Sequence, residues 1–316
     1  MQTLIDRIER LIHRDVGRGM GGVFRATEGG LWGAASALAA SSAPRIGLIT
    51  GFFVPGGDPP AAETDGPAGA ALLAFAFTRI GLPCRVATDT ICQSACRAAL
   101  DAAGASEVPV DILAPEDSAD GLVDLWRRER TDWVIAIERC GPAADGRPRN
   151  MRGTDIAAHA APLDRLFSAG PWQTIAIGDG GNEIGMGRVA RSLIAQYVPL
   201  GDRIGCVVPA DFLIAAGVSH WGAYALLAGL AALRPDWSAA ASAALNPALD
   251  RAVVEAMVRD GPAVDGITLR REATIDAVSM DVHHEVLNTI LAAMPRSPNR
   301  VVSRGRGGGT QAPVAG

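Results

Sequence analysis

The chain has 316 residues, of which 48% are hydrophobic and 20% are charged, and its net charge at pH 7 is −5. This length allows one large domain or two smaller ones and excludes minimal scaffolds and fully disordered proteins. All 29 basic residues are Arg, and the absence of Lys excludes Schiff-base and pyridoxal-phosphate enzymes and the Lys-dependent nucleotide P-loop. The acidic balance argues against a nucleic-acid partner.

Features of the chain as a whole predict a cytoplasmic protein with a small-molecule substrate. The longest apolar run, residues 223–233, is too short to cross a bilayer, which needs about 20 residues. Residues 1–14 carry apolar side chains at helical spacing with acids between them, which is typical of an amphipathic helix and not of a signal peptide. The five Cys form an odd set without a C-x-x-C pair, as in reduced proteins, and a homo-oligomer is compatible with all these features.

Short β-rich runs alternate with Ala-rich helical patterns along the first two thirds of the chain. Such alternation predicts an α/β fold with a largely parallel sheet flanked by helices on both faces. The expected strands are 46–50, 85–88, 110–113, 133–137, 174–177 and 205–208. The expected helices are 68–80, 91–103, 118–130, 155–168, 183–197 and 211–233.

The pattern weakens after Pro235. Residues 247–294 predict two further helices and a strand-like segment at 266–269. From Pro295 the sequence lacks apolar anchors, so we expect one domain over 1–294 and a disordered tail over 295–316.

Acidic residues recur just after the expected strands. Glu63 and Asp65 follow the first strand, Asp89 the second, Glu138 the fourth and Asp179 the fifth. The carboxyl ends of parallel strands form the ligand crevice of open α/β sheets, so several of these carboxylates are expected to converge there. Asp89 is interpreted as a helix cap or a loop charge instead.

The segment from Gly178 to Gly187 has five glycines in its ten residues and lies between an expected strand and a helix. Because glycine permits unusual backbone angles and close approach to a ligand, this pattern favours a binding loop. Its partial dinucleotide-binding pattern starts eight residues after the strand, too late for that function. Asp179, Asn182 and Glu183 instead offer oxygen ligands suited to Mg²⁺, Mn²⁺ or a substrate ammonium group.

Another polar loop, residues 138–155, is rich in Arg. Guanidinium groups bind carboxylates in a two-pronged geometry, so Arg139 or Arg152 is expected to hold a substrate carboxylate. Asn150 lies in the same loop and is a further candidate for substrate binding. Among the histidines, His159 just beyond this loop is the best functional candidate, and the others are expected on the surface or in the core.

Six segments together resemble the D-glutamate cyclase C-terminal-domain-like family over most of residues 15–290. They are Gly17-Arg-Gly-Met20, Thr50-Gly-Phe52, Glu63-Thr-Asp-Gly-Pro67, Ile137-Glu-Arg139 with Ala144-Asp-Gly146, Gly178-Asp-Gly-Gly-Asn-Glu183 and Ala216-Gly-Val-Ser-His-Trp-Gly222. The resemblance implies an enzyme that closes D-glutamate to 5-oxo-D-proline with loss of water. In the animal cyclases a hydro-lyase-like domain precedes this one, and the present sequence does not show it.

Lactam closure needs a base for the amine, an acid for the departing oxygen and stabilisation of an oxyanion. On this reading Asp65 or Asp179 is the base and Glu183 or Glu63 the acid, and the sequence does not distinguish them. The expected substrate-binding residues are Arg139, Asn150, Arg152 and Asn182. The expected ligands of Mg²⁺ or Mn²⁺ are Glu63, Asp65, Glu138, Asp179 and Glu183.

Two other functions fit the same acidic crevice. One is a divalent-metal-dependent phosphatase or other hydrolase of small molecules, and the other is a binding protein that senses a metal or metabolite without turning it over. No P-loop is required for any of these, in agreement with the absence of Lys.

Overall fold

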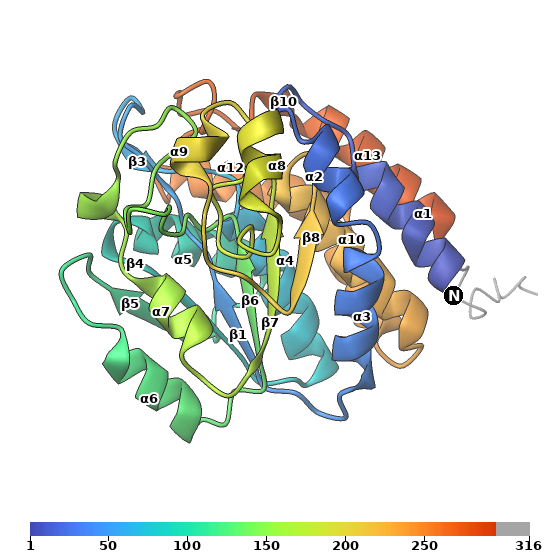
Figure 1. Ribbon diagram of the computed structural model, residues 1–316. Coiled ribbons are helices and arrows are strands. Elements are labelled where there is room, and N and C mark those ends of the chain that lie inside the picture. Colours follow the sequence, from blue (N-terminus) through green and yellow to red (C-terminus); the bar gives the residue numbers. More distant parts are fainter. Residues whose placement is uncertain (295–316) are drawn as a thin grey trace, which may run out of the picture.

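Six parallel strands form the central sheet of the computed structural model, which describes residues 1–294. The strand order is β5-β4-β1-β6-β7-β8, which confirms the predicted α/β fold (Figure 1). The strands are β1 (Ile46–Ile49), β4 (Cys84–Asp89), β5 (Val110–Leu113), β6 (Trp133–Ile137), β7 (Gln173–Gly178) and β8 (Phe212–Ala215). The predicted disordered tail, 295–316, lies outside the described residues.

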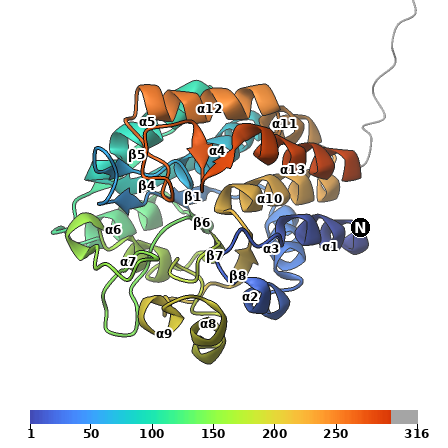
Figure 2. The ribbon, with the colours of Figure 1, turned by 90° about the horizontal axis from the view of Figure 1, so that it is seen from above.

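Helices cover both faces of this sheet, as Figure 2 shows from above. On one face the strands contact α3 (Gly30–Ala40), α4 (Pro67–Ile80), α5 (Gln93–Ala103) and α10 (Ser219–Leu233). An outer layer of α1 (Gln2–Ile12), α11 (Ser238–Ala244), α12 (Pro247–Arg259) and α13 (Met280–Ala293) packs over these helices. The other face packs against α2 (Gly21–Ala26), α6 (Asp120–Arg128), α7 (Leu163–Ser168), α8 (Arg191–Tyr197) and α9 (Gly201–Ile204). The amphipathic helix expected near the N-terminus and the two expected after residue 247 are therefore present.

Alternate residues of each strand enter the two cores, because side chains in a strand point to opposite faces. Ile46 and Leu48 of β1 join the core under α4, whereas Ile49 joins the core under α6. Between them, a Cβ at Gly47 would lie 2.0 Å from the ring of Trp126. Gly47 therefore lets the α6 tryptophan pack directly onto the sheet backbone.

The expected strand at 205–208 is wrong, and the sixth strand is β8 at Phe212–Ala215. Residues 205–208 instead pair with loops, since the Cys206 N–H donates to the Gly181 carbonyl and the Val207 N–H to that of Pro142, both at 3.0 Å. The sequence pattern predicts a helix over 211–233 that includes the residues of β8. The observed helix α10 begins only at Ser219. A short continuous apolar run does not distinguish a buried strand from a helix.

Three other expected elements are shorter or absent. Within 183–197 only α8 is helical, because the Gly185 and Gly187 N–H groups donate to the Val208 carbonyl instead of continuing a helix. Within 155–168 a short 3₁₀ turn, η2 (Ala157–His159), precedes α7, which starts only after Pro162. The segment at 266–269 is a turn, held by Asp265 Oδ1, which accepts the N–H groups of Ile267 and Thr268 at 2.8 Å.

The sheet has its topological switch point between β1 and β6. From β1 the chain adds β4 and β5 on one side, then crosses to add β6, β7 and β8 on the other. The loops that leave β1 and β6 therefore diverge at their carboxyl ends, and such a crevice is where open α/β sheets bind ligands. Two small hairpins border it: β2 (Phe53–Val54) with β3 (Ala61–Ala62), and β9 (Thr274–Ile275) with β10 (Val278–Ser279).

Candidate active site

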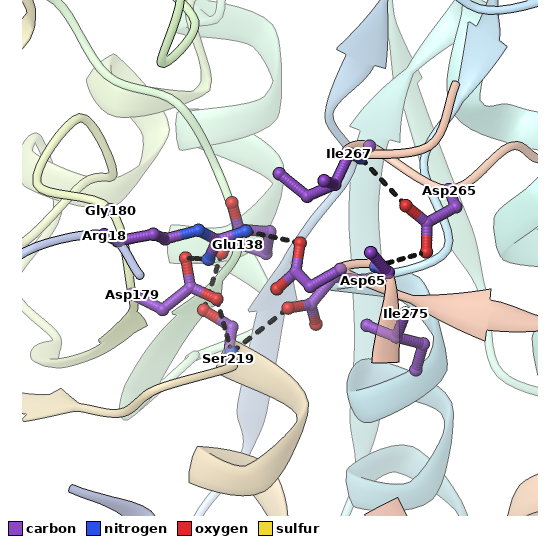
Figure 3. Close-up of polar contacts among 12 residues, drawn as sticks. Arg18, Asp65, Glu138, Asp179, Gly180, Ser219, Asp265, Ile267 and Ile275 are labelled. Atoms are coloured by element: carbon purple, nitrogen blue, oxygen red, sulfur yellow. Dashed lines mark hydrogen bonds and ion pairs between the residues drawn. The ribbon is translucent and has the colours of Figure 1, made fainter. Parts of the chain in front are cut away.

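Three buried carboxylates converge at the switch point. Glu138 and Asp179 directly follow β6 and β7, and Asp65 precedes α4. One carboxylate oxygen from each of the three lies within 4.8 Å of the other two (Figure 3). The prediction that these loops bring their acids to one edge of the sheet is confirmed.

Ser219, the first residue of α10, connects all three carboxylates. Its N–H donates to Asp65 Oδ2 at 3.1 Å and to Asp179 Oδ2 at 2.8 Å. Its hydroxyl donates to Glu138 Oε2 at 2.6 Å. The N-terminal end of a helix carries partial positive charge, so α10 favours the ionised form of acids placed there. Ser219 lies in the segment 216–222, which resembles the cyclase-like family, although its residue type alone predicts no role.

Gly66 allows the Asp65 loop to approach the Glu138 loop. Its φ is 85°, and a Cβ there would lie 2.7 Å from Thr50 Oγ1 and 2.9 Å from Glu138 Cβ. Glu138 itself has a φ of 42°, a left-handed conformation that costs a non-glycine residue free energy of roughly 1–3 kcal/mol. The backbone is thus held in an uncommon shape where the acids meet.

A cavity of about 160 Å³ opens beside these acids. This is room for several water molecules or a small metabolite. Its lining consists of Arg18, Phe52, Phe53, Val54, Glu63, Glu138, Asn150, Met151, Arg152, Asp179, Asn182, Gly266, Ile267 and Asp276. Asp65 and Glu183 are not among these lining residues.

Two cavity residues, Arg18 and Asp276, had no predicted role. The Arg18 guanidinium forms ion pairs with both Asp179 and Asp276, and its side chain is 13% exposed. Arg18 comes from the loop after α1 and Asp276 from the tip of the β9–β10 hairpin. The glycines that flank Arg18 were a usable signal, whereas nothing local in the sequence marks Asp276.

Burial and mutual repulsion raise the pKa values of the acids around the cavity. Burial first, and then neighbouring carboxylates, hold the pKa values of Glu63, Asp65 and Glu138 well above their ordinary range. Burial raises the pKa of Asp179 to about 6 and that of Asp276 to about 7, with Arg18 acting in the opposite direction on both. Protons or added cations are therefore needed to neutralise the cluster at neutral pH.

Glu183 supports the glycine-rich loop from beneath. Its Oε1 accepts the N–H groups of Asp179 at 2.7 Å and of Gly180 at 2.5 Å. Asn182, by contrast, lines the cavity while its side-chain amide donates to the Arg149 carbonyl at 2.8 Å. Glu183 is thus a brace for the backbone at Asp179, which differs from the catalytic and metal-binding roles predicted for it.

Arg139 does not face the cavity, which corrects its predicted role as a carboxylate clamp. Its side chain is 2% exposed and pairs with Asp89. It also donates to the carbonyls of Gly51 at 2.9 Å and Ala161 at 2.6 Å. Asp89, interpreted as a cap or loop charge, is instead the buried partner of this guanidinium.

Comparison with known proteins identifies the family of this site. Residues 8–291 match the family described as D-glutamate cyclase-like, C-terminal. The chain belongs to this family. It is also 32% identical over 209 residues to the D-glutamate cyclase, mitochondrial, of Homo sapiens, an alignment that covers 62% of this chain and 34% of that protein. The matched part of this D-glutamate cyclase-like chain thus spans about a third of the length of its relative.

Two other predicted substrate-binding residues, Asn150 and Arg152, line the cavity, whereas His159 is not among the lining residues. Asn150 lines it, although its Oδ1 is occupied by the N–H groups of Arg152 and Thr154, both at 3.0 Å. Arg152 is exposed, and its guanidinium lies 3.4 Å from the Gly266 and Ile267 carbonyls. His159 packs its ring on Phe53, with 4.4 Å between centroids.

Within residues 1–294 no helix has the length and apolarity needed to span a membrane.

Proposed function

We propose that this chain cyclises D-glutamate to 5-oxo-D-proline with loss of water. The observation that carries the proposal is the convergence of Asp65, Glu138 and Asp179 beside a cavity, in a chain of the D-glutamate cyclase-like family. An acidic cavity attracts the ammonium group of an amino acid and supplies groups that donate and accept protons. The relative named D-glutamate cyclase supports the choice of substrate.

The cavity helps to choose between the acids that the sequence left open. In the reaction the amine nitrogen attacks the γ-carboxyl carbon, a C–N bond forms, and a C–O bond breaks. Asp179 lines the cavity and has a pKa of about 6, so it is the favoured base for the amine. Glu63 lines the cavity and burial holds its pKa well above its ordinary range, so it is the favoured acid for the departing oxygen. The two protons lost by the ammonium group leave in the water, which restores the cluster.

Arg152 is the favoured clamp for the α-carboxylate, because it is the cavity arginine at the solvent-exposed mouth. The ammonium group then lies toward Asp179 and the γ-carboxyl toward Glu63. Three separate contacts distinguish the two enantiomers of glutamate, and the relative named D-glutamate cyclase supports the D form as the substrate. Asn150 and Asn182 border the same volume and are proposed to position the substrate.

A divalent cation fits the residues of this site. Asp65, Glu138 and Asp179 present oxygen atoms within 4.8 Å of one another, and Glu63 borders the same space. Carboxylate oxygens without His or Cys suit Mg²⁺ or Mn²⁺. When bound, such an ion would offset the negative charge of the cluster and polarise the γ-carboxyl group. Glu183 is outside this cluster, because it does not line the cavity and its Oε1 accepts the N–H groups of Asp179 and Gly180.

Product analysis tests the proposal directly. The protein is incubated with D-glutamate, L-glutamate or a simple phosphate ester, each with Mg²⁺, Mn²⁺ or a chelator, and products are separated by chiral chromatography. We expect 5-oxo-D-proline from the D form alone. Asp179→Asn should lower turnover by roughly 10²–10⁴-fold, whereas Asp236→Asn, an exposed acid paired with Arg234, should leave it unchanged.

Other outcomes identify the alternatives. Hydrolysis of the phosphate ester without 5-oxoproline would replace the cyclase by a metal-dependent phosphatase. Binding of D-glutamate or metal without any turnover would favour the sensing protein instead.

A further inference from the structure

The loop between α1 and α2 is shaped to deliver Arg18 into the cavity. Asp15 Oδ1 accepts the N–H groups of Gly17 at 2.9 Å and of Arg18 at 2.8 Å. Gly17 and Gly19 have φ values of 103° and 77°, and a Cβ at Gly19 would lie 2.2 Å from the Tyr197 carbonyl oxygen. Gly19 therefore allows this close approach, and the positive φ of both glycines gives the loop the turn that directs Arg18 inward.

A second element holds the Arg18 guanidinium from the opposite side. The β9–β10 hairpin turns at Asp276 and Ala277, with φ values of 57° and 61°. Such turns prefer Asn-Gly or Asp-Gly, because the left-handed conformation is unfavourable for an alanine. Asp265 Oδ2 supports the turn by accepting the Ala277 N–H at 2.8 Å and the Thr274 hydroxyl at 2.7 Å.

The hairpin is also tied to the catalytic acids, since the Thr64 hydroxyl, between Glu63 and Asp65, donates to the Thr274 carbonyl at 2.7 Å. Asp276 is 4% exposed at its side chain and pairs with Arg18 through Oδ1. Its Oδ2 is buried and has no hydrogen-bond partner among the described residues. The strained turn thus places the Asp276 carboxylate beside Arg18, with one of its two oxygens not used by any hydrogen bond among the described residues.

Arg18 and Arg152 are the two cations among the cavity-lining residues. Arg152 is exposed at the mouth, whereas Arg18 lies deep, beside Asp179. A guanidinium group has five N–H donors, and the two ion pairs of Arg18 engage only two of its three nitrogens. Some N–H groups of Arg18 therefore remain available to bind a ligand. They lie next to the acids that would transfer protons to or from that ligand.

These contacts assign a role to each residue, and the assignment rests on the proposed cyclisation. We propose that Arg18 is a catalytic residue that binds the γ-carboxyl group and stabilises the negative charge on its oxygen as the ring closes. Asp276 is a positioning residue, which holds Arg18 in place through the hairpin. The substrate is then bound by two arginines at different depths, as suits a dicarboxylate of limited length.

The test compares steady-state kinetics with D-glutamate for Arg18→Gln, Arg18→Lys and the control Arg147→Gln. Arg147 belongs to an exposed ion pair with Asp155 outside the cavity. Arg18→Gln should lower kcat by roughly 10²–10³-fold, as for the loss of one oxyanion donor. Arg18→Lys keeps the charge and should recover part of this loss, and added guanidinium ion should partly restore an Arg18→Ala variant.

Asp276→Asn should lower kcat by roughly 10–100-fold, as for other residues that orient a functional group. Asp276→Glu should recover part of the loss, and added guanidinium should not restore Asp276→Asn because Arg18 is still present. Binding of 5-oxo-D-proline, measured by calorimetry, reports on each variant independently of turnover.

The outcomes separate this inference from the proposed function. If the wild type forms 5-oxoproline and folded Arg18→Gln matches Arg147→Gln in kcat, the role of Arg18 is wrong and the cyclase proposal stands. If the wild type gives no turnover yet binds 5-oxo-D-proline, and Arg18→Gln abolishes that binding, the cyclase proposal fails. Arg18 then remains a ligand-binding residue. If the wild type neither binds nor turns over these compounds, both are overturned.

Discussion

Arg139, which is buried, and Arg18, which is half-buried, differ in what surrounds them. Arg139 faces one carboxylate, Asp89, and backbone carbonyls of Gly51 and Ala161 complete its contacts. Asp89 Oδ1 in turn accepts the Ala161 N–H at 2.6 Å. Arg18 lies instead among an excess of carboxylates and borders a cavity. A balanced pair closed by backbone groups is structural, whereas a cation outnumbered by acids beside open space is available to a ligand.

The largest expected effect on stability follows from breaking the balanced pair. Arg139→Gln leaves Asp89 buried without its cation, which should lower the free energy of unfolding by about 3–5 kcal/mol. Arg18→Gln should cost less, because Asp179 and Asp276 can take up protons instead. Urea unfolding of both variants measures the difference. Equal losses would show that both arginines are structural and would remove the contrast.

Metal affinity sharpens the same contrast. Asp179→Asn should weaken Mn²⁺ binding by at least roughly 10-fold, because it removes an oxygen from the carboxylate cluster. Arg18→Gln should strengthen it, since a nearby cation repels the metal. Calorimetry with Mn²⁺ measures both, with Asp236→Asn as the control. Unchanged affinity in Asp179→Asn would exclude this residue as a ligand.

The pH dependence of stability tests whether carboxylates outnumber cations around Arg18. Burial raises the pKa of Asp276 from its ordinary value of 3.8 to about 7 in the folded state. The folded state therefore binds its proton more tightly, and the stability gained below pH 3.8 is lost as the pH rises to about 7. Wild type should lose unfolding free energy relative to Asp276→Asn over this interval.

The comparison with the variant is needed because other groups act in the opposite direction. Burial lowers the pKa values of His13 and His283 to about 4, so their contributions grow as the pH rises. These contributions are common to both proteins and cancel in the difference. Parallel stability curves for wild type and Asp276→Asn would contradict the raised pKa.

The smallest effect is expected at Glu183. In Glu183→Gln the amide oxygen can still accept the N–H groups of Asp179 and Gly180, so stability should change by only about 1 kcal/mol. Turnover should stay near that of the wild type, as measured in the 5-oxoproline assay. A loss as large as that of Asp179→Asn would restore the catalytic role predicted from the sequence.

Local patterns in the sequence were sufficient for most of the sheet. Five of the six expected strands are present, because each is a short apolar run between turn signals whose alternate residues meet two apolar layers. The sixth was misplaced to 205–208, where the chain is apolar but bonds to the glycine-rich loop. The error arises because a run of apolar residues indicates that a segment is buried. It does not indicate whether the backbone of that segment pairs with a strand or with a loop.

The order of strands and acids along the chain was sufficient to predict that Asp65, Glu138 and Asp179 converge, because parallel strand ends meet at one edge of a sheet. Which arginine belongs to the site depends on long-range packing. Arg139 follows a strand yet turns to Asp89, while Arg18 and Asp276 come from opposite ends of the chain. Contacts between distant segments depend on how the layers pack around the crevice, which no local spacing of residues records.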